Sequence, residues 1–150
     1  MAVTMSGEFV LPADKATVWS RLNDAETLKA SIPGCESLEK LSDTEMQAVV
    51  KVKIGPVSAR FKGKVNLTDI DAPNSYRIAG QGEGGVAGFA KGGANVRLSD
   101  VDGGGTKLSY EVDAQVGGKI AQLGSRLIDG SARKLAGEFF GNFAKALETA

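Results

Sequence analysis

Hydrophobic and polar residues alternate along most of the chain between Met46 and Val116. Alternation with a period of two is typical of β-strands that bury one face. Turn sequences separate the alternating segments, as at Gly55-Pro56 and at Asp102–Gly105. The pattern therefore predicts consecutive strands at residues 46–54, 57–68, 76–84, 87–100 and 106–116.

The N-terminal part of the chain predicts one more strand and two short helices. Residues 3–11 alternate loosely and predict a first strand that ends at Pro12. Pro12 and Asp14 are start signals for a short helix. A second short helix is expected over residues 25–30, before Pro33-Gly34, because the residue before a proline avoids the helical region.

The C-terminal part of the chain has the helical period instead. Apolar residues recur there at spacings of mostly three or four, which predicts one long helix over residues 119–147. Asp129-Gly130-Ser131 is a weak helical stretch, and we expect a bend or a local break at this point. The apolar positions are Ile120, Leu123, Leu127, Ile128, Leu135, Phe139, Phe143 and Leu147.

These elements predict an α+β fold in a single domain over residues 1–150. Two of the strands are about fourteen residues long, and twisted strands longer than about ten residues do not stay flat. We therefore expect a curved antiparallel sheet wrapped around the long C-terminal helix, with the two short helices inserted after the first strand.

Small residues are concentrated in the middle of the predicted inward face. A packed core would have larger apolar side chains there, so these positions predict a hollow between sheet and helix. Alternatively, the glycines serve only the curvature of the sheet and the close approach of the helix. We expect the hollow. The small residues are Ala48, Ala59, Gly63, Gly80, Gly82, Gly84, Ala90, Gly92, Ala94 and Ala114.

Composition excludes several classes of function. The 18 basic residues equal the 18 acidic ones, so no net field favours nucleic acid. Histidine is absent, which excludes Ser-His-Asp and Cys-His catalysis and histidine metal ligation. We expect no catalytic residues, no metal and no cofactor. Cys35 is the single cysteine, and with no signal sequence or long apolar run it indicates a soluble, cytoplasmic protein.

Two local features suggest chemistry that we do not expect. Gly80, Gly82 and Gly85 match a dinucleotide-binding fingerprint, but a strand-like segment follows them where that motif requires a helix. Cys35 has no histidine or second cysteine to activate it, so we interpret it as a half-buried structural residue.

Four ordered segments resemble the family of carbon monoxide dehydrogenase G subunits, part of the START-like, polyketide-cyclase-like helix-grip superfamily. The resemblance covers nearly the whole chain and implies a helix-grip fold, in agreement with the pattern above. The segments are PADKATVWSRLND (12–24), IPGCE (32–36), KIGPVSARFKGKV (53–65) and GGKIAQLGSRLIDGSARKLAGEFFGNF (117–143).

The resemblance also implies a function. The superfamily holds bulky apolar ligands between the sheet and the long helix, and this family is associated with molybdenum hydroxylases of the carbon monoxide dehydrogenase type. Its proposed roles are membrane recruitment or maturation of that enzyme, or binding of a quinone or other lipid. Some members carry a C-terminal extension for membrane attachment. This sequence ends at Ala150 without one, so we expect at most transient contact with the inner membrane face.

Our expectation is a non-catalytic accessory protein that binds a lipid or an isoprenoid quinone in its cavity. Tyr76 and Tyr110 are the expected polar groups for a ligand carbonyl or hydroxyl. The first half of the long helix, through Leu127, is expected to face the ligand, and Phe139 and Phe143 to hold the helix on the sheet. The predicted cavity residues are Trp19, Phe61, Tyr76, Phe89, Tyr110, Leu123, Leu127 and Phe139.

Two alternatives remain open from the sequence. A cyclase- or aromatase-like enzyme would use the same cavity, with a tyrosine or a buried carboxylate as acid or base. An assembly factor would act through its helix surface instead. Phe139 and Phe140 lie about 100° apart around a helix, so both are buried only if the helix is contacted on two sides. We expect burial within the chain, and Phe140 is the candidate contact if the second side meets a partner protein or a membrane surface instead.

Overall fold

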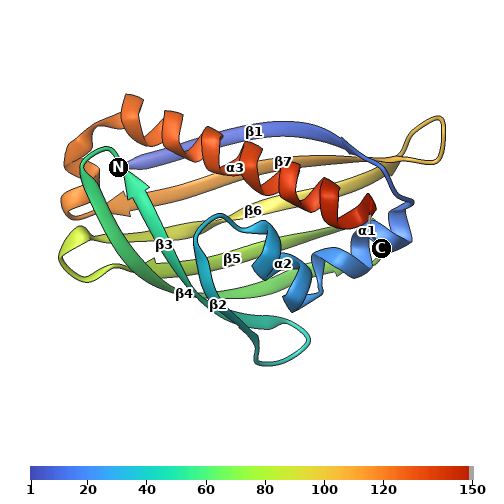
Figure 1. The fold of residues 1–150 in the computed structure, drawn as a ribbon, viewed down its shortest axis with the longest axis horizontal. Helices are drawn as coiled ribbons and strands as arrows, with labels where there is room; N and C mark the ends of the chain where they lie inside the picture. Colours follow the sequence, from blue (N-terminus) through green and yellow to red (C-terminus); the bar gives the residue numbers. More distant parts are fainter. Residues whose placement is uncertain (149–150) are drawn as a thin grey trace.

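The computed structural model describes residues 1–148 and contains one antiparallel sheet of seven strands (Figure 1). The strands are ordered β1-β7-β6-β5-β4-β3-β2, so every sequential pair after β1 is adjacent and β1 closes against β7. Ala150, where the sequence ends, lies outside the described residues. The strands are β1 (Ala2–Leu11), β2 (Cys35–Lys40), β3 (Glu45–Ile54), β4 (Val57–Asp71), β5 (Ser75–Glu83), β6 (Phe89–Asp100) and β7 (Thr106–Gly117).

Two short helices follow β1, as the sequence predicted: α1 (Lys15–Leu22) and α2 (Ala25–Ser31). Each begins at an aspartate whose carboxylate accepts a hydrogen bond from a backbone N–H in the first turn. The Asp14 side chain accepts from Thr17 N at 2.9 Å, and the Asp24 side chain accepts from Thr27 N at 3.1 Å. These caps satisfy backbone donors that have no partner within the helix.

The long C-terminal helix, α3 (Ser125–Glu148), lies across the sheet and contacts β1 and α2 (Figure 1). It is shorter than predicted, because Gly124 has φ +93° and separates it from a short 3-10 helix, η2 (Lys119–Leu123). The break expected at residues 129–131 is wrong, since α3 is continuous there. The interruption lies before α3 begins, at a glycine in a backbone conformation that other residues avoid.

Strand β2 was not predicted. Only Leu38 within it is a sizeable apolar side chain, and the pairing with β3 shifts register between Cys35 and Ser37. An irregularity of this kind places consecutive residues out of the two-residue alternation. The segment therefore has no period that a sequence pattern could identify.

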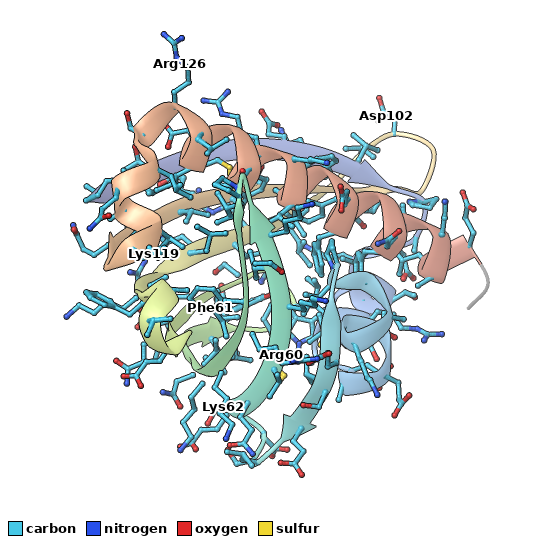
Figure 2. All side chains as sticks on the ribbon, turned by 60° about the vertical axis from the view of Figure 1, so that its left-hand side comes forward. Arg60, Phe61, Lys62, Asp102, Lys119 and Arg126 are labelled. Atoms are coloured by element: carbon cyan, nitrogen blue, oxygen red, sulfur yellow. The ribbon has the colours of Figure 1, made fainter. Side chains whose placement is uncertain are left out.

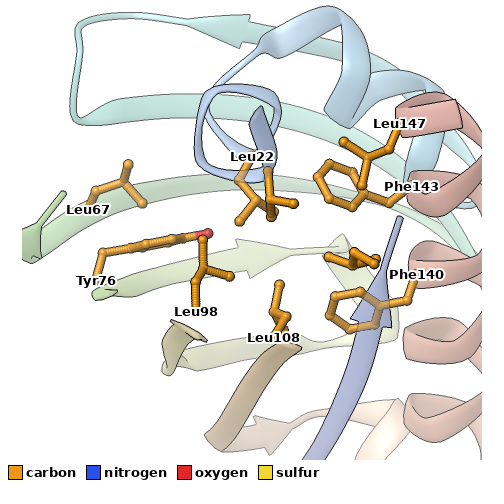
Figure 3. Close-up of a cluster of buried hydrophobic side chains, with 10 residues drawn as sticks. Leu22, Leu67, Tyr76, Leu98, Leu108, Phe140, Phe143 and Leu147 are labelled. Atoms are coloured by element: carbon orange, nitrogen blue, oxygen red, sulfur yellow. The ribbon is translucent and has the colours of Figure 1, made fainter. Parts of the chain in front are cut away.

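Among residues 1–148, the buried apolar side chains form two separate clusters. The larger one lies where α1 and the C-terminal half of α3 meet the sheet (Figure 3). The smaller one lies near η2, η1 (Gly85–Ala87) and the start of α3. The larger cluster comprises Leu11, Val18, Leu22, Leu67, Tyr76, Leu98, Leu108, Phe140, Phe143 and Leu147. The smaller comprises Val3, Ala87, Val116, Ile120 and Ile128.

Candidate functional site

An apolar hollow of about 380 Å³ lies between the inner face of the sheet, the short helices and the C-terminal half of α3. This volume is near the lower end of the range found for small-molecule sites. Nearly all of the side chains that line it are aliphatic or aromatic. The lining consists of Leu22, Leu28, Ile32, Leu38, Met46, Gln47, Ala48, Val50, Phe61, Gly63, Val65, Leu67, Tyr76, Ile78, Val96, Leu108, Phe139 and Phe140.

The lining has two residues with polar side chains, Gln47 and Tyr76. The amide of Gln47 is exposed and donates a hydrogen bond to Glu39 Oε2 at 2.8 Å, so it is engaged at the outer surface. Tyr76 is buried, and its burial raises the pKa of the phenol well above its ordinary value. The hollow therefore has an apolar wall with one neutral hydroxyl group.

Three of the predicted cavity residues, Phe61, Tyr76 and Phe139, line this hollow. Phe61 is inside because it alternates with Arg60 and Lys62, which point to solvent on either side of it (Figure 2). Trp19 lies one layer behind the lining. Its ring meets that of Tyr76 edge to face, with 5.3 Å between the ring centroids.

The other predicted cavity residues lie elsewhere. Phe89 is 45% exposed, because the regular pairing of β6 with β7 turns it to the face opposite Ala90. Leu123 belongs to η2 and is not part of the lining. Leu127 is 38% exposed and lies over Gly55, where the turn between β3 and β4 meets the helix.

Tyr110 is also outside the lining. It pairs across the sheet with Gly7, and its ring lies over that glycine: a β-carbon at Gly7 would come within 2.7 Å of the Tyr110 hydroxyl oxygen. Its ring also lies near the rings of Phe9 and Phe140, at centroid distances of 6.4 and 5.4 Å. Tyr110 therefore packs as part of the core.

Phe140 is buried within the chain, as we expected of this pair of rings, and the alternative of a partner surface at Phe140 is wrong. It is only 8% exposed and stacks on Phe9, with 4.3 Å between the ring centroids. Phe140 is covered because α3 contacts β1, the strand that carries Phe9, whereas Phe139 is half-buried and borders the hollow. The two rings therefore differ in burial, which the helical period by itself did not reveal.

The expected division of α3 is only partly confirmed. Phe143 packs in the larger core cluster as expected, but the first half of the helix does not face the hollow. Its C-terminal half, with Phe139 and Phe140, borders the hollow. Its N-terminal half packs through Ile128 into the smaller core cluster. The hollow lies toward the C-terminal half of α3 because neighbouring side chains fill the space over two glycines, one in β5 and one in the turn after it. Val65 lies over Gly80, and the Phe61 ring lies over Gly84.

The part of the lining that the sequence did not identify comes from α2 and β2. Leu28 and Ile32 are four residues apart, a spacing that places both side chains on one side of α2 and its end. That spacing was a detectable signal. Leu38 of β2 was not detectable, because its strand lacks a period.

Metal ligands, the single cysteine and membrane-spanning helices are the other candidate features of residues 1–148. No group of three or more potential metal-ligating side chains occurs among residues 1–148. Cys35 is half-buried, and burial raises the pKa of its thiol, which lowers the fraction of reactive thiolate. Within the same residues, no helix is both long enough and apolar enough to cross a membrane.

Comparison with known proteins gives a family and a fold. Residues 7–148 match the family of carbon monoxide dehydrogenase G subunits (CoxG). Among curated proteins, none matches the chain by sequence. A conserved protein from Geobacillus kaustophilus has a similar structure, with a TM-score of 0.91 and 31% identity over 98% of this chain and 96% of that one.

More distant structures share the fold. The Zhui aromatase/cyclase from Streptomyces sp. R1128 has a TM-score of 0.72 and 11% identity, covering 99% of this chain and 94% of its own. A START superfamily protein from Mycobacterium smegmatis has a TM-score of 0.65 and 20% identity, with coverages of 97% and 94%. The curved sheet around a long C-terminal helix is thus a helix-grip fold, which the START superfamily protein from Mycobacterium smegmatis shares.

Proposed function

Because the chain belongs to the family of carbon monoxide dehydrogenase G subunits, we propose that it is a non-catalytic protein that binds an apolar small molecule in its hollow. A lipid or an isoprenoid quinone is the class of ligand that we propose. The observation that carries this proposal is the hollow itself: about 380 Å³ of space with an almost wholly apolar wall. Empty apolar space of that size costs stability, and an apolar ligand that fills it recovers dispersion contacts.

We further propose that binding serves a molybdenum hydroxylase of the carbon monoxide dehydrogenase type, in its recruitment to the membrane or its maturation. The family match supports this part of the proposal. The protein would act in the cytoplasm, with transient contact at the inner membrane face. A carrier of this kind would shield the apolar ligand from water between the membrane and the enzyme.

The test of ligand binding uses the protein as purified. Native mass spectrometry and solvent extraction should detect a co-purifying apolar molecule. Addition of a short-chain isoprenoid quinone at about one hundred times its Kd should raise the unfolding temperature by roughly 5–10 °C, from the free energy of binding to the folded state. Absence of both a bound molecule and a thermal shift would reject the proposal.

A cyclase-like enzyme is the second candidate, favoured by the likeness of the fold to an aromatase/cyclase. Within the lining of the hollow, acid–base chemistry would depend on Tyr76. Burial raises the pKa of this phenol, which makes it a poor base at neutral pH. We therefore favour binding over catalysis. Conversion of an aromatic polyketide substrate, lost in Tyr76→Phe, would reverse this preference.

A further inference from the structure

Tyr76 is the one polar side chain of the hollow that has no partner among the described residues. The other buried polar side chains donate hydrogen bonds or accept them. Ser31 Oγ donates to Thr27 O at 2.7 Å, and Thr106 Oγ1 donates to Ala13 O at 2.8 Å. Tyr76 is 8% exposed, and its hydroxyl forms no hydrogen bond within residues 1–148.

The Tyr76 oxygen is not fully enclosed by other atoms of the described residues. In the described part of the chain, every fully enclosed side-chain oxygen and nitrogen has a hydrogen-bond partner. Because the Tyr76 oxygen has no partner, it must be partly open to its surroundings. The side chain extends from β5 toward Leu98 and Leu22, which belong to the same core cluster (Figure 3). Because Tyr76 and Leu22 both line the hollow, the hollow is the space that this hydroxyl meets.

The ring is held in that position. Trp19 packs edge to face against it, and β5 fixes its backbone between β4 and β6. A hydroxyl on a fixed ring donates a hydrogen bond in a defined place, at little further cost in side-chain entropy. An acceptor on a ligand at that place would satisfy a donor that is otherwise buried and unpaired.

We infer that the hollow selects uncharged ligands that carry an oxygen acceptor, such as a ketone or quinone carbonyl, through a hydrogen bond from the Tyr76 hydroxyl. This inference rests on the proposed function, since it concerns the same hollow. Among the described residues, the lining of the hollow contains no cationic side chain. A carboxylate or phosphate would therefore enter an apolar space without a compensating charge, which is strongly unfavourable. A plain hydrocarbon would enter but leave the donor unpaired.

Three matched probes separate these effects. Acetylnaphthalene carries a carbonyl, isopropenylnaphthalene has a methylene group in place of the carbonyl oxygen, and naphthoate carries a carboxylate. Their affinities are measured by isothermal titration calorimetry. For the wild-type protein we expect the ketone to bind roughly five- to tenfold more tightly than the hydrocarbon. The carboxylate should bind at least about tenfold more weakly than the ketone.

Two tyrosine variants test the assignment. Tyr76→Phe should abolish the preference for the ketone and leave hydrocarbon affinity nearly unchanged. Tyr110→Phe is the matched control, because Tyr110 lies over Gly7 and outside the lining. It removes the same atom and should keep the preference. A ketone preference that persists in Tyr76→Phe, or that is absent from the wild-type protein, would overturn the inference.

A second measurement needs no variant, which matters if Tyr76→Phe folds poorly. The infrared band of an isotope-labelled ketone carbonyl should shift to lower frequency on binding to the wild-type protein, as hydrogen-bonded carbonyls do. An unshifted band of the bound ketone would overturn the inference and leave the proposed function intact. Failure of all three probes to bind would overturn both.

Discussion

Glycines on the inward face of the sheet have different roles within the same strand. At Gly80, an added β-carbon would lie 2.6 Å from the Lys64 carbonyl oxygen and 2.5 Å from Val65 Cγ1. At Gly82, two residues along β5, the nearest atom would be the Lys62 carbonyl oxygen at 3.6 Å, an ordinary contact. Gly80 thus permits a close approach of β4 and β5 that a side chain would prevent.

The first prediction compares these two positions. Gly80→Ala should lower the free energy of unfolding by about 1–3 kcal/mol, since backbone must move to accommodate the methyl group. Gly82→Ala, the matched control, should change it by less than about 0.5 kcal/mol. Urea unfolding measures both. Equal losses of stability at the two positions would show that the close approach of β4 and β5 does not require a glycine at position 80.

Residue-level inferences from the sequence succeeded where a side chain's position follows from the alternation of its strand. Phe61 and Tyr76 lie inside for this reason. Phe89 was placed inside against the alternation, on the assumption that its strand bends, and it lies outside because the pairing stays regular. Tyr110 obeys the alternation, but its ring lies over Gly7 in the adjacent strand, a contact that depends on the register of β1 with β7.

At the level of elements, α2 depends on a charged cap. The Asp24 carboxylate accepts hydrogen bonds from Thr27 N at 3.1 Å and Thr27 Oγ1 at 2.6 Å, and Arg21 lies 3.9 Å away. The hydrogen bonds to Thr27 lower the pKa of Asp24 in the folded state. Because α2 forms part of the wall of the hollow, this cap supports the candidate site as well as the helix.

The second prediction concerns this cap and pH. Asp24→Ala should lower the free energy of unfolding by about 1 kcal/mol at pH 7. A carboxyl group whose pKa is lower when folded stabilises the protein above its unfolded pKa, near 3.8, and this contribution is lost as pH falls through the folded pKa. The difference between the wild-type protein and the variant should therefore shrink below about pH 4.

Thermal unfolding between pH 2 and pH 7 measures this difference. Asp102→Ala, in the exposed turn between β6 and β7, controls for the general effect of removing a carboxylate. A difference that is constant down to the lowest pH would mean that the charged form of Asp24 is not what stabilises α2.

The two halves of α3 also differ in what they contribute. Phe143 is fully buried in the larger core cluster, whereas Leu127 is 38% exposed at the other end of the helix. Both residues belong to the same apolar pattern, and that pattern does not indicate which of them is more deeply buried. The ranking follows from where α1 and β1 contact the helix, which is a property of the tertiary structure.

The third prediction follows from this difference. Phe143→Ala should lower the free energy of unfolding by about 3–5 kcal/mol, because it removes a ring from a closely packed site. Leu127→Ala should lower it by about 1 kcal/mol or less. Chemical denaturation of the two variants makes the comparison. Similar losses in both would mean that α3 is anchored evenly along its length.

At the level of the whole molecule, the sequence predicted the curved sheet, the three helices and an apolar hollow between them. It did not predict where the hollow lies. Alternation determines which face of a strand is inward, but two further facts locate the hollow: α2 and β2 form part of its wall, and Val65 covers Gly80. Both are packing arrangements between different segments of the chain. Most of the expected cavity residues were therefore outside the lining.

The hollow borders the larger core cluster, since Leu67 and Leu108 belong to both, so its filling should affect the stability of the fold. Ala48 lines the hollow from β3. Ala79 lies on β5, on the face opposite Ile78, another residue of the lining. Phenylalanine at Ala48 should occupy the space of the ligand, whereas the same residue at Ala79 should lie on the outer face.

The fourth prediction uses this pair. Ala48→Phe should raise the free energy of unfolding of the ligand-free protein by about 0.5–2 kcal/mol, as cavity filling commonly does. It should also weaken binding of an apolar probe such as acetylnaphthalene by at least about tenfold, since ring and probe compete for one volume. Ala79→Phe should leave the affinity within about twofold of the wild-type value. Urea unfolding and calorimetric titration give the two quantities, and undiminished affinity in Ala48→Phe would place the ligand outside the hollow.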